Sequence, residues 1–343
     1  MTDEITVLSI EDQEAWIAEH RRDGLPSQSW GYAWGLAASG IEPKLAVVRS
    51  RGARMLMPFF EREWNQTTDI ATLLGLSGAS IVPPSDAPLL LWHDFARRQG
   101  WVAGYIQLSI FLETLVEAPV GDVVSGNSVF LLDLQSGDGP LSQISRTIRR
   151  KLRHAADSGA VLVEDQHALA KRLVELYPLT MRRVGAAPIY TVSPETLIRW
   201  AHDNGSLTLG AKIDGSIEAV YVFRFAGPHA ESHILGATDK GRDLIAWLIE
   251  RGAARLKQNG VRWLNLGGGV RPGDGVYRFK ARFNGVLKPL RAIRQVYDSA
   301  RYQALCDAAG VSSPQPYFPA YRAASPLQDR ALDPGTPDRT ECS

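Results

Sequence analysis

The chain has 343 residues, of which 45% are hydrophobic and 22% are charged, and this composition excludes a disordered or fibrous protein. Its length allows two domains with sizeable cores. The formal net charge of +1 excludes an overall field that attracts nucleic acid or membranes, so a polyanionic partner requires a local basic patch.

Several features favour a cytoplasmic location. The two cysteines, Cys306 and Cys342, lack the spacing of a disulfide framework or a cysteine zinc site, which favours a reducing compartment. The N-terminus is acidic and lacks the apolar core of a signal peptide, and no apolar run is long enough to span a membrane.

The first half of the chain predicts strands and helices in a definite order. A helix near residue 30 is expected to be capped by Ser27 or Gln28. The apolar patterns predict a strand over 5–10, helices over 13–22 and 29–39, strands over 44–49, 55–61 and 70–76, a helix over 87–99 and a strand over 102–108.

The second half repeats part of this order. A unit of three strands, a helix and a strand occurs twice, which predicts an α/β fold with mixed α+β sheets in two similarly folded domains. The repeated elements are strands over 207–213, 217–225 and 231–237, a helix over 243–258 and a strand over 261–266.

The two domains are expected to be joined through a strand over 129–134 and a turn-forming break at 137–140. This break divides the chain into an N-terminal domain, a C-terminal domain that carries the glycine loop described below, and a C-terminal helix with an irregular tail. The expected boundaries are 1–136, 137–300 and 301–343.

A basic helix is predicted over 141–158. Its apolar residues recur on one side, so the helix is expected to bury that side and to expose another. Arginines at i, i+3, i+4 and i+7 share the exposed side and suit bidentate contacts with phosphates, although charge stripes are most often only solvated. This arginine stripe consists of Arg146, Arg149, Arg150 and Arg153.

The segment His229-Ala230-Glu231-Ser232-His233 half matches the His-x-Glu motif of zinc deaminases, but no Pro-Cys-x-x-Cys sequence follows it. Its first, third and fifth residues alternate along a predicted strand and are expected to project from one face. A polar edge or the lining of a substrate cleft explains them better than a metal site does. His233 is therefore a candidate substrate contact, and no metal is expected.

A glycine turn, Gly267-Gly268-Gly269, follows the predicted strand over 261–266. It removes three Cβ atoms where the strand ends, which lets backbone N–H groups approach a ligand closely. Loops at strand ends commonly form ligand sites.

A short helix is expected to start near Gly275. On it, Tyr277 and Lys280 are three residues apart and share one face, whereas Phe279 and Phe283 share another. One face can then anchor the helix while the other contacts a ligand. From spacing alone, a functional site and a flexible turn with a solvated lysine are equally good interpretations.

The repeated unit is the core order of the GNAT acyltransferase fold, and the chain resembles a tandem version of it, the Fem (FemABX-like) aminoacyltransferases. The resemblance covers most of the chain, residues 25–296, and its most specific part is the glycine loop with the Phe279-Lys280 pair. The stretches that carry it are Gln28-Ser29-Trp30, Arg149–Arg153 with Gly159, Leu176–Arg182 and Leu264–Phe283.

The resemblance implies an enzyme that transfers an aminoacyl group from a charged tRNA to an acceptor amine and forms an amide bond. It implies no cofactor beyond this co-substrate. Contacts with the phosphates of the tRNA are expected from the arginine stripe and from two arginines beside the glycine loop. These residues are Arg146, Arg149, Arg150, Arg153, Arg278 and Arg282.

The resemblance gives Lys280 the role of a fixed cation near the ester carbonyl or the terminal ribose and phosphates, and Phe279 the pocket wall beside it. Residue chemistry agrees, because a donor at the carbonyl oxygen that becomes negative contributes about 2.7–4 kcal/mol. The amides of Gly268 and Gly269 are further candidate donors. Asp274 is the nearest acidic candidate for the proton acceptor, although a substrate phosphate or water suits this role equally well.

The acceptor amine is less well defined. Relatives that modify peptidoglycan carry a lysine soon after the tryptophan of the first motif, whereas here Tyr32 and Trp34 follow Trp30. This change favours a smaller or less anionic acceptor, such as an antibiotic-like metabolite, over a cell-wall precursor. Arg182 fits either an acceptor carboxylate or a favourable helix end, and Tyr277 is a further candidate contact.

Two alternatives remain open. The first is an acyl-CoA-dependent N-acyltransferase, but the turn that should grip the pyrophosphate has one glycine and two acids over 237–243. The second is a catalytically inactive tandem domain that only binds a metabolite or RNA. The presence of both Lys280 and the glycine loop favours an enzyme over this second alternative.

Overall fold

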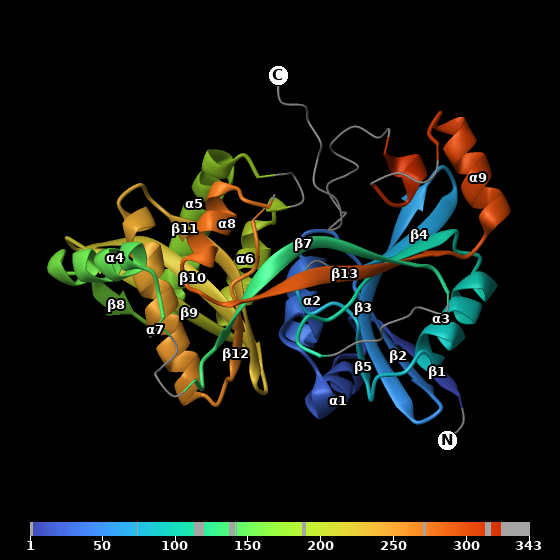
Figure 1. Cartoon of the computed structure of the whole chain (residues 1–343), viewed down its shortest axis with the longest axis horizontal. Coiled ribbons are helices and arrows are strands. Elements are labelled where there is room, and N and C mark those ends of the chain that lie inside the picture. The colour runs from blue at the N-terminus through green and yellow to red at the C-terminus, as the bar shows by residue number, and fades with distance from the viewer. Residues whose placement is uncertain are drawn as a thin grey trace. The chain divides into compact units, whose positions relative to one another are not determined.

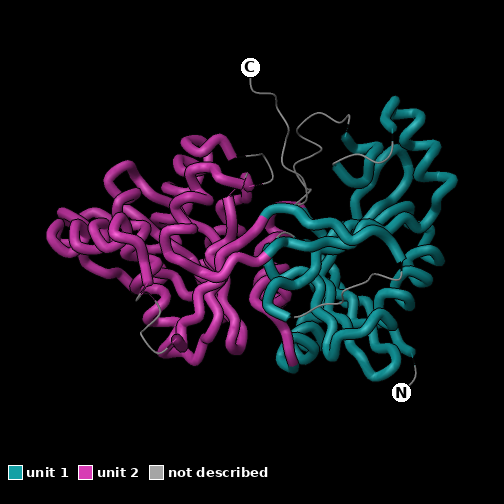
Figure 2. Tube along the Cα trace, in the orientation of Figure 1, with its two compact units in different colours: residues 1–22, 41–127, 289–343 teal, residues 23–40, 128–288 magenta. Residues whose placement is uncertain are grey.

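A computed structural model describes two compact units (Figures 1 and 2). None of the described helices is long and apolar enough to cross a membrane. Unit 1 comprises Met1–Arg22, Ile41–Asn127 and Pro289–Ser343, and unit 2 comprises Asp23–Gly40 and Ser128–Lys288. The described residues are 3–73, 75–112, 120–136, 141, 143–186, 190–269, 272–312 and 317–323. The predicted break at 137–140 lies outside them, as does most of the predicted tail.

Unit 1 is built on strands in the order β1-β2-β3-β4-β6-β13, with β5 paired to β3. Trp92 of α3 meets Phe59 of β3 edge to face at 5.3 Å inside its core. Its elements are β1 (Glu4–Leu8), α1 (Gln13–Asp23), β2 (Lys44–Ser50), β3 (Ala53–Trp64), β4 (Thr67–Thr72), β5 (Ser80–Val82), α3 (Ala87–Arg98), β6 (Ala103–Gln107), α9 (Ser299–Ala308) and η4 (Ala320–Arg322).

Unit 2 is built on strands in the order β7-β12-β11-β10-β9-β8. Its elements are η1 (Pro26–Gln28), α2 (Trp30–Ala37), α4 (Arg146–Asp157), β8 (Val161–Val163), α5 (Gln166–Val184), α6 (Pro194–His202), β9 (Ser206–Ile213), β10 (Ser216–Ala226), β11 (His229–Ala237), η3 (Gly241–Leu244), α7 (Ile245–Gln258), β12 (Trp263–Asn265) and α8 (Gly275–Ala281). Two longer strands, β7 (Asp122–Asp133) and β13 (Val286–Val296), contribute residues to both units.

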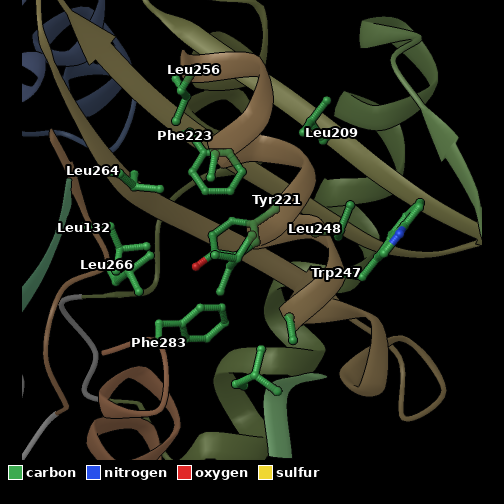
Figure 3. Packing of buried hydrophobic residues seen from close by; sticks show 14 of the residues in the cluster. Leu132, Leu209, Tyr221, Phe223, Trp247, Leu248, Leu256, Leu264, Leu266 and Phe283 are labelled. Atoms are coloured by element: carbon green, nitrogen blue, oxygen red, sulfur yellow. The ribbon is translucent and has the colours of Figure 1, made fainter. Parts of the chain in front are cut away.

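The main core of unit 2 lies on one face of its sheet, where α4 and α7 pack (Figure 3). Ile148 of α4 and Leu248 of α7 are fully buried there. On the opposite face, α5 approaches the strands so closely that a Cβ at Gly236 would lie 2.7 Å from Leu176. The glycine of β11 therefore allows a helix to pack directly on the backbone of the sheet.

The predicted repeat is confirmed, and with it the α/β class with mixed sheets. In unit 1, β2, β3 and β4 are antiparallel neighbours, α3 follows, and β6 then pairs with β4 in parallel. In unit 2, β9, β10 and β11 form the same meander, α7 follows, and β12 pairs with β11 in parallel. Parallel neighbours require a long crossover, which the helix supplies in each unit.

The units do not follow the expected boundaries at residues 136 and 300. The chain enters unit 2 within β7, between Asn127 and Ser128, and returns to unit 1 within β13, between Lys288 and Pro289. The reason is strand pairing, because the last residues of β7 pair with β12 and the last residues of β13 pair with β6. A chain break predicted from turn residues cannot detect such an exchange of strands.

Part of the expected irregular tail is ordered in unit 1. Asp69 is fully buried on β4, where it accepts hydrogen bonds from Arg62 Nε at 2.6 Å, Tyr321 at 2.8 Å and Arg322 Nε at 2.7 Å. Charge-assisted bonds of this kind compensate for burying the carboxylate. They fix the segment 317–323, which includes η4, beside β3 and β4.

The segment 23–40 belongs to unit 2, although residues of unit 1 flank it in sequence. It packs through the glycine face of α2, because a Cβ at Gly31 would lie 1.8 Å from Asp203 Oδ1, and one at Gly35 would lie 2.2 Å from Trp200 Nε1. Thr196 of α6 also donates to the carbonyl of Gly35 at 2.8 Å. The two glycines thus let α2 and α6 approach within backbone contact.

The helix α2 begins one residue later than expected and is capped by Ser29, whose hydroxyl accepts the N–H of Tyr32. The expected caps, Ser27 and Gln28, lie in η1 instead. The predicted helix over 141–158 likewise begins only at Arg146, because Ser145 caps it. The strands β5, β8 and β13 and the helix α6 were not predicted; β5 and β8 have three residues each, too few for a periodic pattern.

We expect Gly35→Ala to destabilise unit 2 by about 1–3 kcal/mol, because the new methyl group overpacks the contact with Trp200. Urea unfolding followed by tryptophan fluorescence measures the change. Gly126→Ala is the control, since the nearest atom to its Cβ would be 3.8 Å away. Equal unfolding midpoints for the two variants would contradict the close approach of α2 and α6.

Candidate functional site

The strands β11 and β12 part after a short parallel ladder. The ladder ends at the pair Glu231 and Asn265. Beyond it, β11 stays beside β10 as far as Ala237, whereas the chain after Asn265 stays beside β7, since Leu266 N–H donates to Phe130 O at 2.9 Å. We call the pair Glu231 and Asn265 the vertex. The carboxyl ends of parallel strands that diverge are a common place for ligands.

The glycine loop follows the vertex directly. Gly267 has a φ of 72°, in the region that favours glycine, and its N–H donates to Asn265 Oδ1 at 2.7 Å. The carbonyl of Gly268 accepts a hydrogen bond from Lys280 Nζ at 2.8 Å. A Cβ at Gly269 would lie 2.2 Å from Asp274 Oδ1, so this position needs glycine. The loop is therefore fastened by Asn265 from one side and by Lys280 from another.

The helix α8 carries Phe279 and Lys280, and its N-cap is Asp274, which accepts the N–H of Tyr277 at 2.7 Å. Tyr277 meets the ring of Phe130 edge to face at 4.9 Å and packs against the core, as Phe279 does. Phe283 lies beyond the end of the helix, but its buried ring contacts Phe279 at 5.4 Å. These contacts anchor α8, while the catalytic and substrate roles of its residues stay predictions.

Lys280 is a partly buried cation. Burial lowers the pKa of Lys280 to about 8, against the opposing effect of the Asp274 carboxylate. An exposed lysine titrates near 10.4. The ammonium of Lys280 therefore carries its charge at neutral pH and loses it as the pH rises through about 8.

A row of buried polar side chains crosses the sheet of unit 2 at the vertex. The register pairs Ser206 with Arg224, Arg224 with Glu231, and Glu231 with Asn265, and directly paired residues project from the same face. All four side chains belong to residues that are at most 8% exposed. We call these four residues the polar row. They face away from the core, because Leu264 and Leu266 on either side of Asn265 point into it (Figure 3).

The polar row also holds the segment 23–40. Ser27 donates to Glu231 Oε2 at 2.8 Å, and Arg224 donates to Ser29 Oγ and to Asp203 Oδ2, both at 2.7 Å. The sequence predicts the strand of Glu231 correctly but does not single out Arg224 and Asn265. Each of these is one polar residue inside an apolar strand, and that is the signal of the row in the sequence.

His233 and Tyr32, two of the predicted substrate contacts, lie together on this face. Tyr32 is buried and stacks on Trp200 at 5.3 Å, and the ring of His233 meets Trp200 edge to face at 4.4 Å. Burial, followed by the charge of Arg224, lowers the pKa of His233 well below its usual range, so its imidazole is neutral at pH 7. Glu231 and His233, two of the three residues predicted to share a face, both contact the segment 23–40.

Trp30 and Trp34 stack on each other at 5.4 Å on α2, and the guanidinium of Arg199 lies 4.0 Å from the ring centre of Trp34. Trp34 is 37% exposed. Arg182 is exposed in the last turn of α5, where its charge favours the helix end. The structure does not bring Arg182 together with the vertex through any contact among the described residues.

The arginine stripe is exposed on α4, while Ile148 and Ala155 bury the other side, as predicted. The first turn of α4 is tied to the end of α8, since Ser145 N–H donates to the carbonyl of Arg282 at 2.9 Å. This bond brings Arg282 next to the start of the stripe. The backbone of Arg282 and the start of the arginine stripe are therefore neighbours, although they are far apart in sequence.

Backbone N–H groups of the turn over 237–243 are hydrogen-bonded within the turn itself. Gly241 N–H donates to Thr238 Oγ1 at 3.0 Å, and Arg242 N–H donates to Thr238 O at 3.1 Å. Its acids are paired as well, because Asp239 contacts Arg183 at 3.2 Å and Asp243 contacts Lys151 at 2.7 Å. The turn thus offers few free donors to a diphosphate. In the part of the chain that is described, no cluster of His, Cys, Asp and Glu is arranged to hold a metal ion.

No family model matches this sequence, and no curated protein matches it. Solved structures match its fold. FemX is 13% identical, with a TM-score of 0.64 over 88% of this chain and 99% of FemX. L-PGS from Bacillus licheniformis is 11% identical, with a TM-score of 0.59 over 94% of this chain and 96% of L-PGS. A conserved protein of unknown function from Bacteroides thetaiotaomicron is 10% identical, with a TM-score of 0.58 over 86% of this chain and 100% of that protein.

The match with FemX confirms, at the level of the fold, the resemblance to the Fem aminoacyltransferases that the motifs indicated. It extends over both units, in agreement with a tandem fold. At these identities the likeness concerns the fold alone, so the function has to be argued from the residues of the site.

We expect Asp274→Asn to move the pKa of Lys280 further below 8, because the carboxylate that opposes the effect of burial is removed. Asparagine keeps the helix cap. NMR titration of the lysine ε-CH₂ signals, assigned with Lys280→Arg, measures the shift. Asp239→Asn is the control, and an unchanged Lys280 titration in Asp274→Asn would contradict the electrostatic pairing.

Proposed function

We propose that this protein transfers an aminoacyl group from a charged tRNA to an acceptor amine. The observation that carries the proposal is the Lys280 ammonium, which is partly buried and fastened to the glycine loop at the vertex. The fold match with FemX supports an acyl-transfer reaction of this general kind. No resident cofactor is required, because the activated ester of the donor supplies the driving force.

The reaction breaks one ester bond and forms one amide bond. The nitrogen of the neutral acceptor amine attacks the ester carbonyl carbon, and negative charge collects on the carbonyl oxygen. A fixed cation at this oxygen stabilises the charge most effectively where water is excluded. The ester bond then breaks, the ribose oxygen leaves, and the proton lost by the amine is transferred to it through solvent or a nearby base. Lys280 is our candidate for the cation.

Phe279 supports this role by fixing the position of Lys280. Its ring packs against the core and against buried Phe283, so the helix turn that carries the ammonium is anchored on its apolar side. Asp274 is engaged as the cap of α8 and interacts electrostatically with Lys280. These contacts make it a positioning residue in our proposal, and the proton acceptor is left to substrate or water.

The surface beside α8 supports an RNA-linked donor over a thioester. The arginine stripe and Arg282 offer guanidinium groups to phosphates, as recognition of a tRNA acceptor end requires. The turn over 237–243, which would hold the pyrophosphate of CoA, has its Gly241 and Arg242 N–H groups bonded internally. An acyl-CoA donor is the alternative that the donor experiment below distinguishes.

The aromatic residues of the segment 23–40 support a small acceptor of low negative charge. Trp34 presents an exposed ring beside Arg199, and buried Tyr32 anchors the helix α2 against Trp200. An exposed aromatic ring favours flat or apolar amines, including amines of secondary metabolites, over a phosphorylated cell-wall precursor.

Lys280 should leave a diagnostic pH profile. As a cation, it makes kcat/KM for amide formation fall as pH rises through about 8, because the ammonium loses its proton there. In Lys280→Arg this fall should move to much higher pH, since guanidinium stays charged. Comparing the two proteins on one acceptor cancels the ionisation of the amine. A wild-type rate that instead rises through pH 8 relative to the variant would mean that Lys280 acts as a base.

The donor is tested in two separate reactions. Each contains the protein and a panel of acceptor amines; one receives a full set of charged tRNAs and the other receives acyl-CoAs. We expect amide product only with charged tRNA, and none after RNase treatment. The double variant Arg150→Ala/Arg153→Ala should raise KM for tRNA. It should also reduce the slope of the logarithm of the binding constant against the logarithm of the salt concentration by about two, one for each lost phosphate contact. Arg97→Ala/Arg98→Ala on α3 is the control. RNase-insensitive product from acyl-CoA would overturn the tRNA proposal.

A further inference from the structure

The polar row ends at the vertex with a donor for which the described residues provide no partner. Asn265 is fully buried, and its Oδ1 accepts the N–H of Gly267 at 2.7 Å, which fixes the orientation of the amide. Its Nδ2 has no hydrogen-bond partner among the described residues. Buried donors without partners are rare in folded proteins. The Asn265 amide therefore has room for an acceptor atom that the described residues do not supply.

Glu231 lies directly beside this donor. Its carboxylate is only 2% exposed, and its residue is paired with Asn265 across neighbouring strands, which lie about 4.7–4.9 Å apart. The two side chains project from the same face, so a buried anion and an amide N–H group stand side by side. A carboxylate and an amide donor that lie side by side complement a ligand that carries a cation and, close to it, an acceptor oxygen.

An aminoacyl ester has this arrangement, because only the α-carbon and the carbonyl carbon lie between its ammonium nitrogen and its carbonyl oxygen. An acetyl or other plain acyl group has the oxygen but no cation. The vertex also lies next to the proposed cation, since Asn265 holds Gly267 and Lys280 holds the adjacent Gly268. Both side chains are thus fastened to consecutive residues of one loop.

We propose that Glu231 and Asn265 form the subsite for the α-ammonium and the carbonyl oxygen of the donor, and that Glu231 selects aminoacyl over plain acyl groups. This inference rests on the proposed function and deepens it. Glu231 accepts the ammonium, and Asn265 Nδ2 donates to the carbonyl oxygen. Ser27, which donates to Glu231 Oε2 at 2.8 Å, orients the carboxylate from the segment 23–40.

The test is the binding of unreactive donor analogues to the full chain, which needs no turnover. The probes are 3′-aminoacylamino-3′-deoxyadenosines of the twenty amino acids and a matched set whose acyl groups lack the α-amino group. We expect the best aminoacyl probe to bind wild-type protein at least about 30-fold more tightly than its match, as a charge-assisted contact allows. Equal affinities, or no binding of either set at millimolar concentration, would overturn the proposal.

Variants separate recognition from a merely structural role of Glu231. Glu231→Gln keeps the shape and removes the charge, and its preference for aminoacyl probes should fall below about threefold. Glu231→Asp keeps the charge and should retain a preference. Ser27→Ala, which removes a contact to the same carboxylate, should also keep most of the preference. A full preference in Glu231→Gln would overturn the assignment. If that variant does not fold, the comparison of the two probe sets on the wild-type protein still tests the proposal.

Failure of the proposed function would look different. In that case charged tRNA and acceptor amines would yield no amide, while the difference in probe binding and its loss in Glu231→Gln would remain. Conversely, amide formation from charged tRNA with equal binding of both probe sets would leave the proposed function standing and overturn the vertex subsite.

Discussion

The parting of β11 and β12 is the constraint on which the candidate site depends. The parallel ladder between them ends at Glu231 and Asn265, after which β11 follows β10 and the other chain follows β7. Where two adjacent strands diverge, their facing backbone groups no longer pair with each other and can bond to other partners. The glycine loop, its anchors Asn265 and Lys280, and the helix α8 all begin from this divergence.

Burial around the loop sets the electrostatics of the site. Lys280 loses solvent when α8 packs through Phe279 against the core, and this lowers its pKa towards neutrality even though Asp274 lies close by. In the polar row, Arg224 donates to the hydroxyl of Ser29 and forms an ion pair with Asp203, and its charge lowers the pKa of His233 in addition to burial. A cation is thus held at the loop, and a neutral imidazole lies beside the aromatic residues of the segment 23–40.

The segment 23–40 completes unit 2 from a distant part of the sequence. The glycine face of α2 allows contact with α6, and Ser27 and Ser29 then bond to the polar row, so packing and polar recognition act together. Because the buried polar row needs partners, the segment satisfies groups that strands alone would leave unpaired. The same segment presents Trp34 at the surface, which connects the fold of unit 2 to the proposed acceptor.

Local patterns predict the repeated order of strands and helices, the α/β class, the buried and exposed sides of α4 and the helix that carries Lys280. These features depend on periodicity and capping among neighbouring residues. Four features could be seen only in the folded chain: the exchange of β7 and β13 between units, the place of the segment 23–40, the pairing of Glu231 with Asn265 and the junction of Ser145 with Arg282. These depend on strand register and on burial between residues far apart in the chain, and a buried polar residue such as Arg224 shows its role only when its partners are known.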